Sequence, residues 1–245
     1  MPALFLSDAH LSEQRPEQLP VFRAVLERAT ARGAAVYILG DLVEFWPGDD
    51  DDAPFHREVV AALARFSASG GALHVALGNR DFLLGQRFAE DTGAQLLPDY
   101  STLSLAGVTA LIGHGDLLCT RDIKYQLFRQ FVRDATNQQK FLASPLAERR
   151  RIAAQTREGT AASMTEKDDH IMDVDEAEVL RVMQAHNATL LIHGHTHRPG
   201  QHELVDGDLR RQRYVLGDWY SEGTVLWVEG ANCRLLSTSA FLATT

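Results

Sequence analysis

Short apolar runs that end in a small polar motif constrain the fold of this chain more than any other feature. Five of these runs have the length expected of buried strands. They are Ala3–Leu6, Ala35–Leu39, Leu73–Leu77, Val108–Ile112 and Thr189–Ile192. Helical patterns near residues 17–32 and 55–69 separate the first three runs. Because strands alternate with helices, the sequence predicts an α/β fold.

The pattern changes after Gly200, where short β runs alternate with turns such as Asp206-Gly207 and Glu229-Gly230. The β runs are Gln201–Val205, Arg211–Leu216, Thr224–Val228 and Cys233–Leu236. We expect them to form a second, more antiparallel sheet at the C-terminus.

The stretch 120–173 contains no β run and has a helical pattern, so we expect a helical cap inserted within a single domain spanning 1–245. One of its helices is predicted at Ile123–Arg133, with Arg129 and Arg133 opposite a broad apolar face. That face is made of Ile123, Leu127, Phe128, Phe131 and Val132. The cap therefore combines apolar and basic surface.

Charge is unevenly distributed along the chain. The net charge is −9, which disfavours nucleic acid as a partner. Between Arg121 and Arg157, however, nine basic residues stand against three acidic ones, including the run Arg149-Arg150-Arg151. This local balance of +6 predicts an anionic partner for the cap.

The remaining composition fits a soluble protein with a large core. A chain of 245 residues buries roughly three-quarters of the surface of its unfolded form. The two cysteines, Cys119 and Cys233, form no CxxC pattern, which argues against a disulfide scaffold and a thiolate-bound zinc. The residues before Asp8 show no signal peptide, and no run approaches the ~18 apolar residues of a spanning helix. A reducing cytoplasm is the expected compartment.

Polar motifs follow all five predicted strands. They are Asp8-Ala9-His10, Gly40-Asp41, Gly78-Asn79-Arg80-Asp81, Gly113-His114-Gly115-Asp116 and Gly194-His195-Thr196-His197. Ligands of open α/β sheets bind beyond the carboxyl ends of strands, so the five loops can converge. Carboxylate, amide and imidazole groups without thiolates suit Mn²⁺, Fe²⁺, Mg²⁺ or Zn²⁺. Seven such groups exceed the three that one catalytic zinc takes and suit two ions.

Each motif also has an ordinary structural interpretation. Gly40-Asp41 can be a turn, and the Gly78–Asp81 motif can be a turn followed by a helix cap. His193, His195 and His197 alternate, as in an exposed strand edge. Five such motifs in this order, each at a strand end, favour a metal site over these separate explanations.

The ordered set of motifs resembles the calcineurin-like metallophosphoesterases. The resemblance implies two β-sheets packed face to face and flanked by helices, an αββα sandwich with a binuclear metal centre. It assigns one metal to Asp8, His10, Asp41 and His197. It assigns the other metal to Asp41, Asn79, His114 and His195. Asp41 would bridge the two ions, and a bridging hydroxide would be the nucleophile.

Further stretches extend the resemblance over nearly the whole chain. They are Gly48-Asp49-Asp50-Asp51, Cys119-Thr120, Ile171-Met172-Asp173-Val174 and Ile192–Pro199. With the metal motifs, they are similar to the UDP-2,3-diacylglucosamine pyrophosphohydrolases of lipid A biosynthesis. This subfamily resemblance implies two Mn²⁺ per chain and cleavage to UMP and 2,3-diacylglucosamine 1-phosphate (lipid X). It also implies a peripheral protein at the cytoplasmic face of the inner membrane. We expect the protein to be a monomer.

The subfamily resemblance further implies a set of substrate contacts. They are Asn79, Arg80, Asp122, Thr160, Met164, Lys167 and His195. The chain departs from the pattern at two of them, since the subfamily has Ser at 160 and Asn at 164. Thr160 keeps the hydroxyl, whereas Met164 loses the amide and equally fits a core position of the cap.

Arg80 is predicted to act in catalysis together with Asp41. Many relatives in the wider family carry histidine at position 80, where it can assist the leaving group. A phosphomonoester leaving group has a second pKa near ~6 and departs without a proton. A guanidinium that clamps phosphate oxygens then serves better than an acid. The ordinary alternative for Arg80 is a surface partner of a helix cap.

Two other functions remain open from the sequence alone. A phosphodiesterase or phosphomonoesterase acting on a soluble nucleotide would use the same scaffold but would not need a basic, apolar cap. A non-enzymatic scaffold protein would keep the fold and lose its ligands. The complete set of seven ligand-type residues argues against this second alternative.

Overall fold

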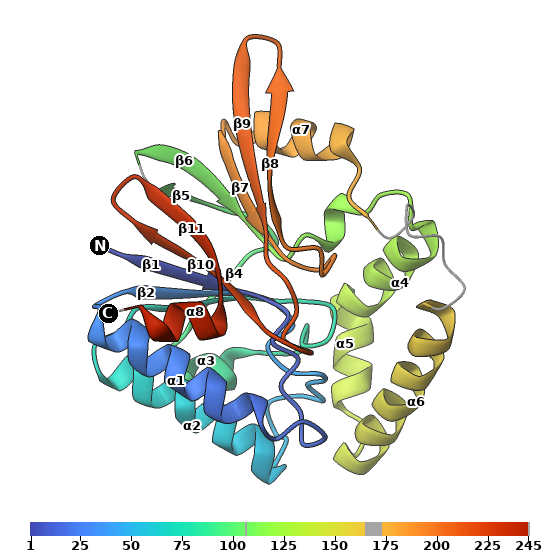
Figure 1. The fold of residues 1–245 in the computed structure, drawn as a ribbon. Coiled ribbons are helices and arrows are strands. Elements are labelled where there is room, and N and C mark those ends of the chain that lie inside the picture. Colours follow the sequence, from blue (N-terminus) through green and yellow to red (C-terminus); the bar gives the residue numbers. More distant parts are fainter. Residues whose placement is uncertain (106, 165–172, 245) are drawn as a thin grey trace.

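The computed structural model describes residues 1–105, 107–164 and 173–244, with the backbone alone for 156–164. Two β-sheets form its centre (Figure 1). The first has the order β11-β10-β1-β2-β3-β4, and the second has the order β5-β6-β7-β9-β8. The first sheet contains β1 (Ala3–Leu6), β2 (Ala35–Leu39), β3 (Leu73–Ala76), β4 (Gln95–Leu97), β10 (Thr224–Glu229) and β11 (Asn232–Ser237). The second contains β5 (Ser101–Leu105), β6 (Val108–Ile112), β7 (Leu190–His193), β8 (Gly200–Asp206) and β9 (Leu209–Val215).

Alternation along the strands explains why the two sheets pack face to face. Successive side chains of a strand point to opposite faces. Phe5 of β1 therefore joins Ile112 and Ile192 of the second sheet in one buried cluster between the sheets. Leu4 and Leu6 point the other way, into the cluster beneath the helices. The first sheet thus has two buried faces, which accounts for its continuous apolar runs.

Helices cover the outer face of each sheet. The first sheet is covered by α1 (Gln18–Ala31), α2 (Pro54–Ala68), α3 (Gln86–Thr92) and α8 (Thr238–Ala243). The second is covered by α7 (Glu176–Ala185), whose Val179 and Met183 pack with Leu111 and Leu191. The predicted sandwich of two sheets between helical layers is confirmed.

The C-terminal strands do not form a separate antiparallel sheet, so that expectation is wrong. β10 pairs antiparallel with β1 and carries β11 to the edge of the first sheet. β9 pairs parallel with β7 in the second sheet and antiparallel with β8. The turns predicted that each pair of strands forms a hairpin. Which of the two sheets a hairpin joins depends on the edge strand that it meets, and that strand lies far away in the sequence. Local sequence does not encode that choice.

The predicted cap consists, in the described residues, of α4 (Ile123–Arg133), α5 (Ala135–Leu142) and α6 (Leu146–Met164), called here the cap helices. A 3-10 turn, Asp116–Leu118, leads into them from β6. Figure 1 shows them beside the sheets, on the side away from the N- and C-termini. No helix in the described ranges is long and apolar enough to cross a lipid bilayer.

Candidate binuclear metal centre

The five motif loops meet at one edge of the sandwich. β1, β2 and β3 run parallel, as do β6 and β7, so their carboxyl ends lie together. Backbone hydrogen bonds join the loops across the chain. Asp8 N donates to Gly40 O (3.1 Å), and His10 N donates to Asp41 O (3.0 Å). Gly194 N donates to His114 O (2.8 Å), which ties the loops of the second sheet together.

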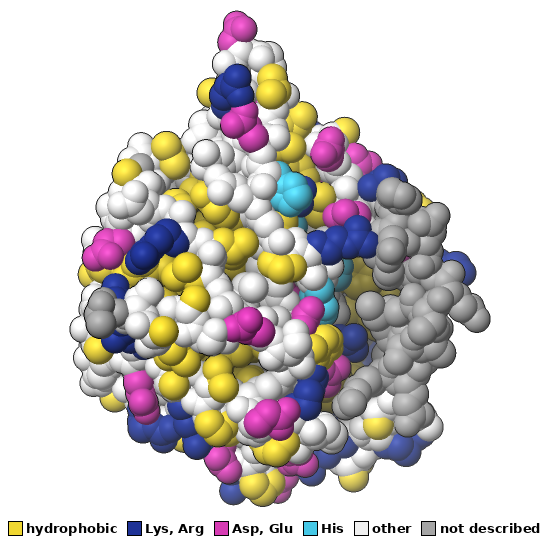
Figure 2. Space-filling view, viewed as in Figure 1, with side chains coloured by type: hydrophobic (Ala, Val, Ile, Leu, Met, Phe, Trp, Pro, Cys, Tyr) yellow, Lys and Arg dark blue, Asp and Glu magenta, His cyan; other side chains and the backbone are white. Residues whose placement is uncertain are grey.

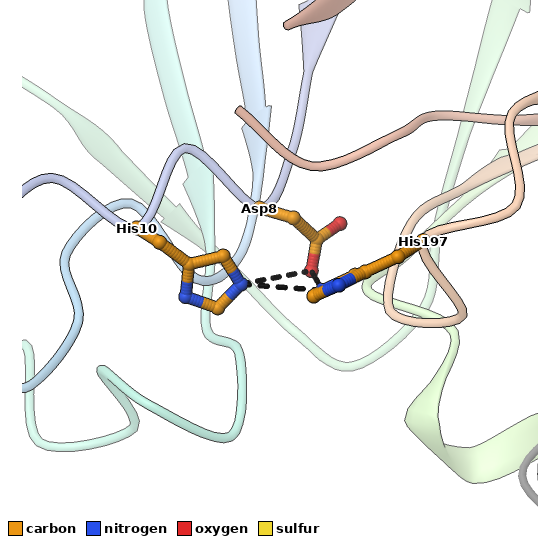
Figure 3. Close-up of side chains that lie close together, drawn as sticks. All are labelled: Asp8, His10 and His197. Atoms are coloured by element: carbon orange, nitrogen blue, oxygen red, sulfur yellow. Dashed lines mark hydrogen bonds and ion pairs between the residues drawn. The ribbon is translucent and has the colours of Figure 1, made fainter. Parts of the chain in front are cut away.

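Asp8, His10 and His197 form the first group of ligand-type atoms (Figure 3). His197 Nε2 lies 3.3 Å and His10 Nε2 lies 3.9 Å from Asp8 Oδ1. The two imidazole nitrogens are 3.2 Å apart. Two rings and a carboxylate thus aim their electron-rich atoms at a common point, although they come from distant loops.

Asn79, His114 and His195 form the second group. Asn79 Oδ1 lies 3.0 Å from both His114 Nε2 and His195 Nδ1. The two imidazole nitrogens are again 3.2 Å apart. The amide group and the two imidazole rings each offer one donor atom, and oxygen and nitrogen donors of this kind suit borderline divalent cations.

Asp41 lies between the two groups. Its Oδ2 atom is 3.8 Å from His10 Nε2 in the first group and 3.8 Å from His114 Nε2 in the second. Its Oδ1 atom accepts a hydrogen bond from Arg80 N (2.8 Å). All seven residues predicted to bind metal are thereby brought together, with Asp41 in the position that a bridging ligand needs.

The backbone at this edge is strained at the predicted ligands. Six non-glycine residues in the described ranges have positive φ, and five belong to the seven. These five are Asp8 (φ 52°), His10 (46°), Asp41 (52°), His195 (67°) and His197 (55°). Each such conformation costs on the order of 1–3 kcal/mol and persists where the surroundings enforce it. Strain concentrated here indicates a site whose geometry is selected for function.

The backbone at Gly78 shows why a glycine must precede Asn79 in the third motif. A Cβ atom at position 78 would lie 2.0 Å from Asp41 Oδ1 and 2.3 Å from Asp41 N. Asp81, fully buried in the same motif, accepts hydrogen bonds from Gly78 N (2.8 Å) and Leu42 N (2.7 Å). The third motif is therefore a turn but not a helix cap, since α3 begins only at Gln86 with Gly85 at its N-cap. The motif also fixes the loop that bears Asp41.

Crowded burial shifts the pKa values of these groups in opposite directions. Burial raises the pKa of Asp41 to about 7. Burial alone would lower the pKa of His114, but the carboxylates of Asp41 and Asp8 raise it to about 9. Burial and the neighbouring His114 lower the pKa of His195 to about 4. The groups compete for protons in a space where a divalent cation would favour the deprotonated form of each.

Two carboxylates behind the histidines were missed by the sequence analysis. Asp218 Oδ2 lies 3.4 Å from Nδ1 of His197, and Glu44 Oε2 lies 3.6 Å from Nδ1 of His10. Such outer partners fix the orientation of a ligating ring and raise its basicity. Glu44 follows Asp41 by three residues, but Asp218 is remote in sequence and carries no motif signal.

Glu44 also links the metal edge to Arg80. Its Oε1 atom lies 4.0 Å from Arg80 Nη1, while Oε2 accepts a hydrogen bond from Arg15 (3.2 Å). Tyr220 stacks on the His10 ring with 4.9 Å between ring centres. Arg80 is thus held at the edge of the cluster by a carboxylate that also approaches a ligand-type histidine.

A cavity of about 480 Å³ opens from this cluster towards the cap helices. Its polar end includes His10, Asp41, Asn79, Arg80 and His195. Its other end is lined by apolar side chains, among them Phe128, Phe131, Phe141 and Ile152. Histidine and basic side chains border a hollow on the face drawn in Figure 2. The cavity therefore has polar side chains at one end and apolar side chains at the other.

Helix α4 faces the body with its polar side. Arg129 is buried and donates to Asp116 Oδ2 (2.7 Å) and Asp99 Oδ1 (2.6 Å). Arg133 donates to the carbonyls of Leu77 (3.1 Å) and Gly78 (3.0 Å), directly before Asn79. The apolar face predicted for this helix consequently points away from the body and partly into the cavity. Arg129 and Arg133 are therefore structural anchors.

The structure describes the side chains of four of the seven predicted substrate contacts. Asn79, Arg80, Asp122 and His195 all line the cavity. Asp122 also caps α4 by accepting from Tyr125 N (3.1 Å). The side chains of Thr160, Met164 and Lys167 lie outside the described residues.

The arginines of the basic run Arg149-Arg150-Arg151 are paired with acidic side chains of the protein itself. Arg149 is 2% exposed and paired with Asp50. Arg150 pairs with Asp51 and Asp52, and Arg151 pairs with Glu148. The run was predicted from local charge, but its neutralising partners come chiefly from a loop about 100 residues earlier.

The chain is similar to known proteins over most of its length. The family model described as calcineurin-like phosphoesterase matches residues 1–199. A protein of Escherichia coli O7:K1 named UDP-2,3-diacylglucosamine hydrolase is 44% identical over 236 residues, covering 96% of this chain and 98% of the relative. A protein of the same name from Salmonella paratyphi B is 44% identical over 237 residues, covering 97% and 99%.

A solved structure described as a novel archaeal phosphodiesterase shares the fold, with a TM-score of 0.51 at 13% identity. It covers 97% of this chain and 99% of its own. The matched residues 1–199 include every residue of the two ligand groups and Asp41. The chain belongs to the calcineurin-like phosphoesterase family.

Proposed function

We propose that this protein hydrolyses the pyrophosphate bond of UDP-2,3-diacylglucosamine to UMP and 2,3-diacylglucosamine 1-phosphate, using two divalent cations, preferably Mn²⁺. One observation carries the proposal, namely the cavity that connects the metal-type cluster to the apolar cap. A substrate with a pyrophosphate at one end and acyl chains at the other matches both ends. The two relatives named UDP-2,3-diacylglucosamine hydrolase support this choice.

The donor set fits two cations. Asp8 Oδ1 is buried, and the atoms that approach it are the Nε2 atoms of His197 (3.3 Å) and His10 (3.9 Å). Oxygen and imidazole donors without a thiolate suit manganese and its neighbours. Asp8, His10, Asp41 and His197 would hold one ion, and Asp41, Asn79, His114 and His195 the other. Bound there, the pair would activate water and neutralise phosphate oxygens.

Arg80 would bind the phosphate that leaves. Its Nε atom is buried without a hydrogen-bond partner in the described part of the chain, and the side chain lines the cavity. A guanidinium in this position offers two parallel donors to phosphate oxygens. Asn79, Asp122 and His195 would contact the substrate beside it, with Thr160, Met164 and Lys167 as the further predicted contacts.

Helix α4 would seat acyl chains and approach the membrane. Ile123, Leu127 and Phe131 follow one another at four-residue intervals and are each more than 60% exposed. An exposed apolar stripe on a helix can enter the headgroup boundary of a lipid surface. We place the protein peripherally at the cytoplasmic face of the inner membrane, held by this stripe together with exposed basic residues such as Lys124.

A panel of nucleotide sugars tests the proposal. Purified protein with Mn²⁺ should convert UDP-2,3-diacylglucosamine to UMP and lipid X and should cleave UDP-N-acetylglucosamine far more slowly. Efficient cleavage of soluble nucleotides with no preference for acyl chains would instead support the phosphodiesterase or phosphomonoesterase alternative. Mass spectrometry of the products identifies the bond that breaks.

A further inference from the structure

We propose that the ion pair between Asp50 and Arg149 is a latch that sets the width of the apolar end of the cavity and thereby the preference for acylated substrates. The inference rests on the proposed function, because it concerns how that substrate is selected. Asp50 belongs to the Asp-rich loop (residues 48–52) of the body, and Arg149 to the first turns of α6.

Arg149 is unusually well enclosed for a cap residue. Its side chain is 2% exposed. Nη1 donates to Pro47 O (2.6 Å) and Asp50 Oδ1 (2.8 Å), Nη2 donates to Asp50 Oδ2, and Nε donates to Ser144 O (3.0 Å). The guanidinium therefore makes a two-pronged bond with one carboxylate while it joins the α5–α6 turn to the body. A buried charge held this way resists displacement, because its loss would leave the partner groups unpaired.

The Asp-rich loop is shaped to receive this side chain. Gly48 has φ +135°, and a Cβ atom there would lie 2.5 Å from Arg149 Nη1. Asp49 accepts hydrogen bonds from Trp46 Nε1 (2.9 Å), Gly85 N (3.1 Å) and Phe88 N (3.0 Å). The loop is thus fixed to α3 by one aspartate and presents the next aspartate to the cap.

A second pair reinforces the latch from the same helix. Arg150 bonds to Asp51, whose side chain is 1% exposed, and to Asp52 (2.7 Å). Asp51 in turn contacts His56 of α2. Consecutive arginines of α6 therefore engage consecutive aspartates of the loop, so the contact depends on this segment of α6 lying in one register against the body.

The latch lies next to both walls of the cavity. Phe45 precedes the Asp-rich loop and lines the cavity from the body. Ile152 and Ala153, one turn beyond Arg149, line it from α6. On the far side, α4 is anchored through Arg129 and Arg133. Because the cap is attached on both sides, the width of the apolar space depends on these contacts. Loss of the Asp50 pair would weaken the attachment of α6 while the Arg150 pairs remain.

The test compares three variants on two substrates. Asp50→Asn keeps the shape of a side chain that is 57% exposed but removes its charge. Arg149→Lys keeps the charge but loses the fork. Arg151→Gln is the matched control, since Arg151 is 54% exposed and pairs with Glu148 of its own helix. The substrates are UDP-2,3-diacylglucosamine and UDP-N-acetylglucosamine, which carries no long acyl chain.

We expect Asp50→Asn and Arg149→Lys to lower kcat/KM for the acylated substrate by about ten- to a hundredfold, the scale of a small misplacement of binding groups. The loss should arise mainly through KM, while cleavage of UDP-N-acetylglucosamine and Mn²⁺ content stay at wild-type values. Amide hydrogen exchange should become faster at 146–153 in both variants. Arg151→Gln should match the wild type in every measurement.

Two results would overturn the inference. One is an equal loss on both substrates, which would make the pair a general support of the fold. The other is unchanged preference and exchange in Asp50→Asn. If the wild-type protein does not cleave the acylated substrate, the proposed function is wrong, and so is the role of the Asp50–Arg149 pair in substrate preference. Hydrogen exchange in the same variants still reports whether the latch holds α6.

Discussion

Two of the predicted metal ligands are each backed by a carboxylate that orients the imidazole ring. His197 is backed by Asp218 and His10 by Glu44, whereas the ligand-type residues Asn79 and His114 meet directly. The groups named from the sequence were those that follow strand ends. Their partners were not named, because Asp218 reaches the site only through the path of the chain after β9. Positive φ at five of the seven positions is likewise invisible in the sequence.

Arg80 gives the first residue-scale prediction. Arg80→Ala should lower kcat by roughly 10²-fold or more, the scale for removal of one donor to a developing charge. Arg80→Lys should restore only part, because lysine lacks the planar fork. Metal content should stay unchanged in both variants, since Arg80 is not one of the predicted ligands and both variants keep the backbone amide that donates to Asp41. Wild-type kcat in Arg80→Ala at saturating substrate would remove Arg80 from the mechanism.

Glu44 and Asp218 form a matched pair for the second prediction. Glu44→Gln and Asp218→Asn should each weaken Mn²⁺ binding by about 10–100-fold, as loss of an outer partner does. With Mn²⁺ at saturation, Asp218→Asn should regain its turnover. Glu44→Gln should stay slower, because Glu44 also lies beside Arg80. Metal titration by calorimetry and kcat at high Mn²⁺ separate the two effects, and identical behaviour of the variants would disprove the link to Arg80.

The pKa of His114 gives a prediction about pH. Because it is raised to about 9, the imidazolium stabilises the metal-free fold fully below about pH 6.5, and this contribution is lost as pH rises through 9. A cation must displace that proton, so Mn²⁺ should bind more tightly at pH 8 than at pH 6. The rise in Tm caused by Mn²⁺ should increase over the same interval. A constant shift would show that no proton leaves on binding.

Among the elements, α4 has the amphipathic pattern that the sequence predicts, but a helix with an apolar stripe normally turns that stripe towards the core. Here Arg129 is buried while Leu127 is 61% exposed. The sequence cannot show the reversal, because the acceptors for Arg129 and Arg133 are Asp99, Asp116 and two carbonyls of the body.

The cavity-facing part of α4 yields a prediction with an internal control. Phe128 and Phe131 line the cavity, so Phe128→Ser with Phe131→Ser should lower kcat/KM for the acylated substrate more than for UDP-N-acetylglucosamine. Each ring contributes on the order of 1.5–3 kcal/mol when fully buried by a ligand. Leu127→Ser changes an exposed residue of the same helix and should leave both values unchanged in detergent solution. Equal slowing of the two substrates would make these rings structural.

At the scale of the whole molecule, the site lies where the carboxyl ends of strands from two sheets meet beneath the cap. Strand and helix alternation predicted an α/β fold, and the polar motifs predicted that the five loops converge. The arrangement in two sheets was implied by the resemblance to the calcineurin-like metallophosphoesterases. The positions of β10 and β11 and the pairing of the basic run were not predictable, since both depend on contacts between distant segments. The protein has a net charge of −9, yet its cap is locally basic. Arginines of α6 in this basic segment form ion pairs with the Asp-rich loop, so their charges are neutralised within the protein.

Titration of metal-free protein with Mn²⁺, with turnover of UDP-2,3-diacylglucosamine followed at each addition, tests the central claim most directly. We expect no turnover in the chelated protein and a rise that ends at about two ions per chain, as in two-metal sites. Asp41→Ala should lose tight binding of both ions and at least roughly 10²-fold in turnover, because it removes the group between them. Full activity with one ion per chain, or near wild-type turnover in Asp41→Ala, would contradict the binuclear account.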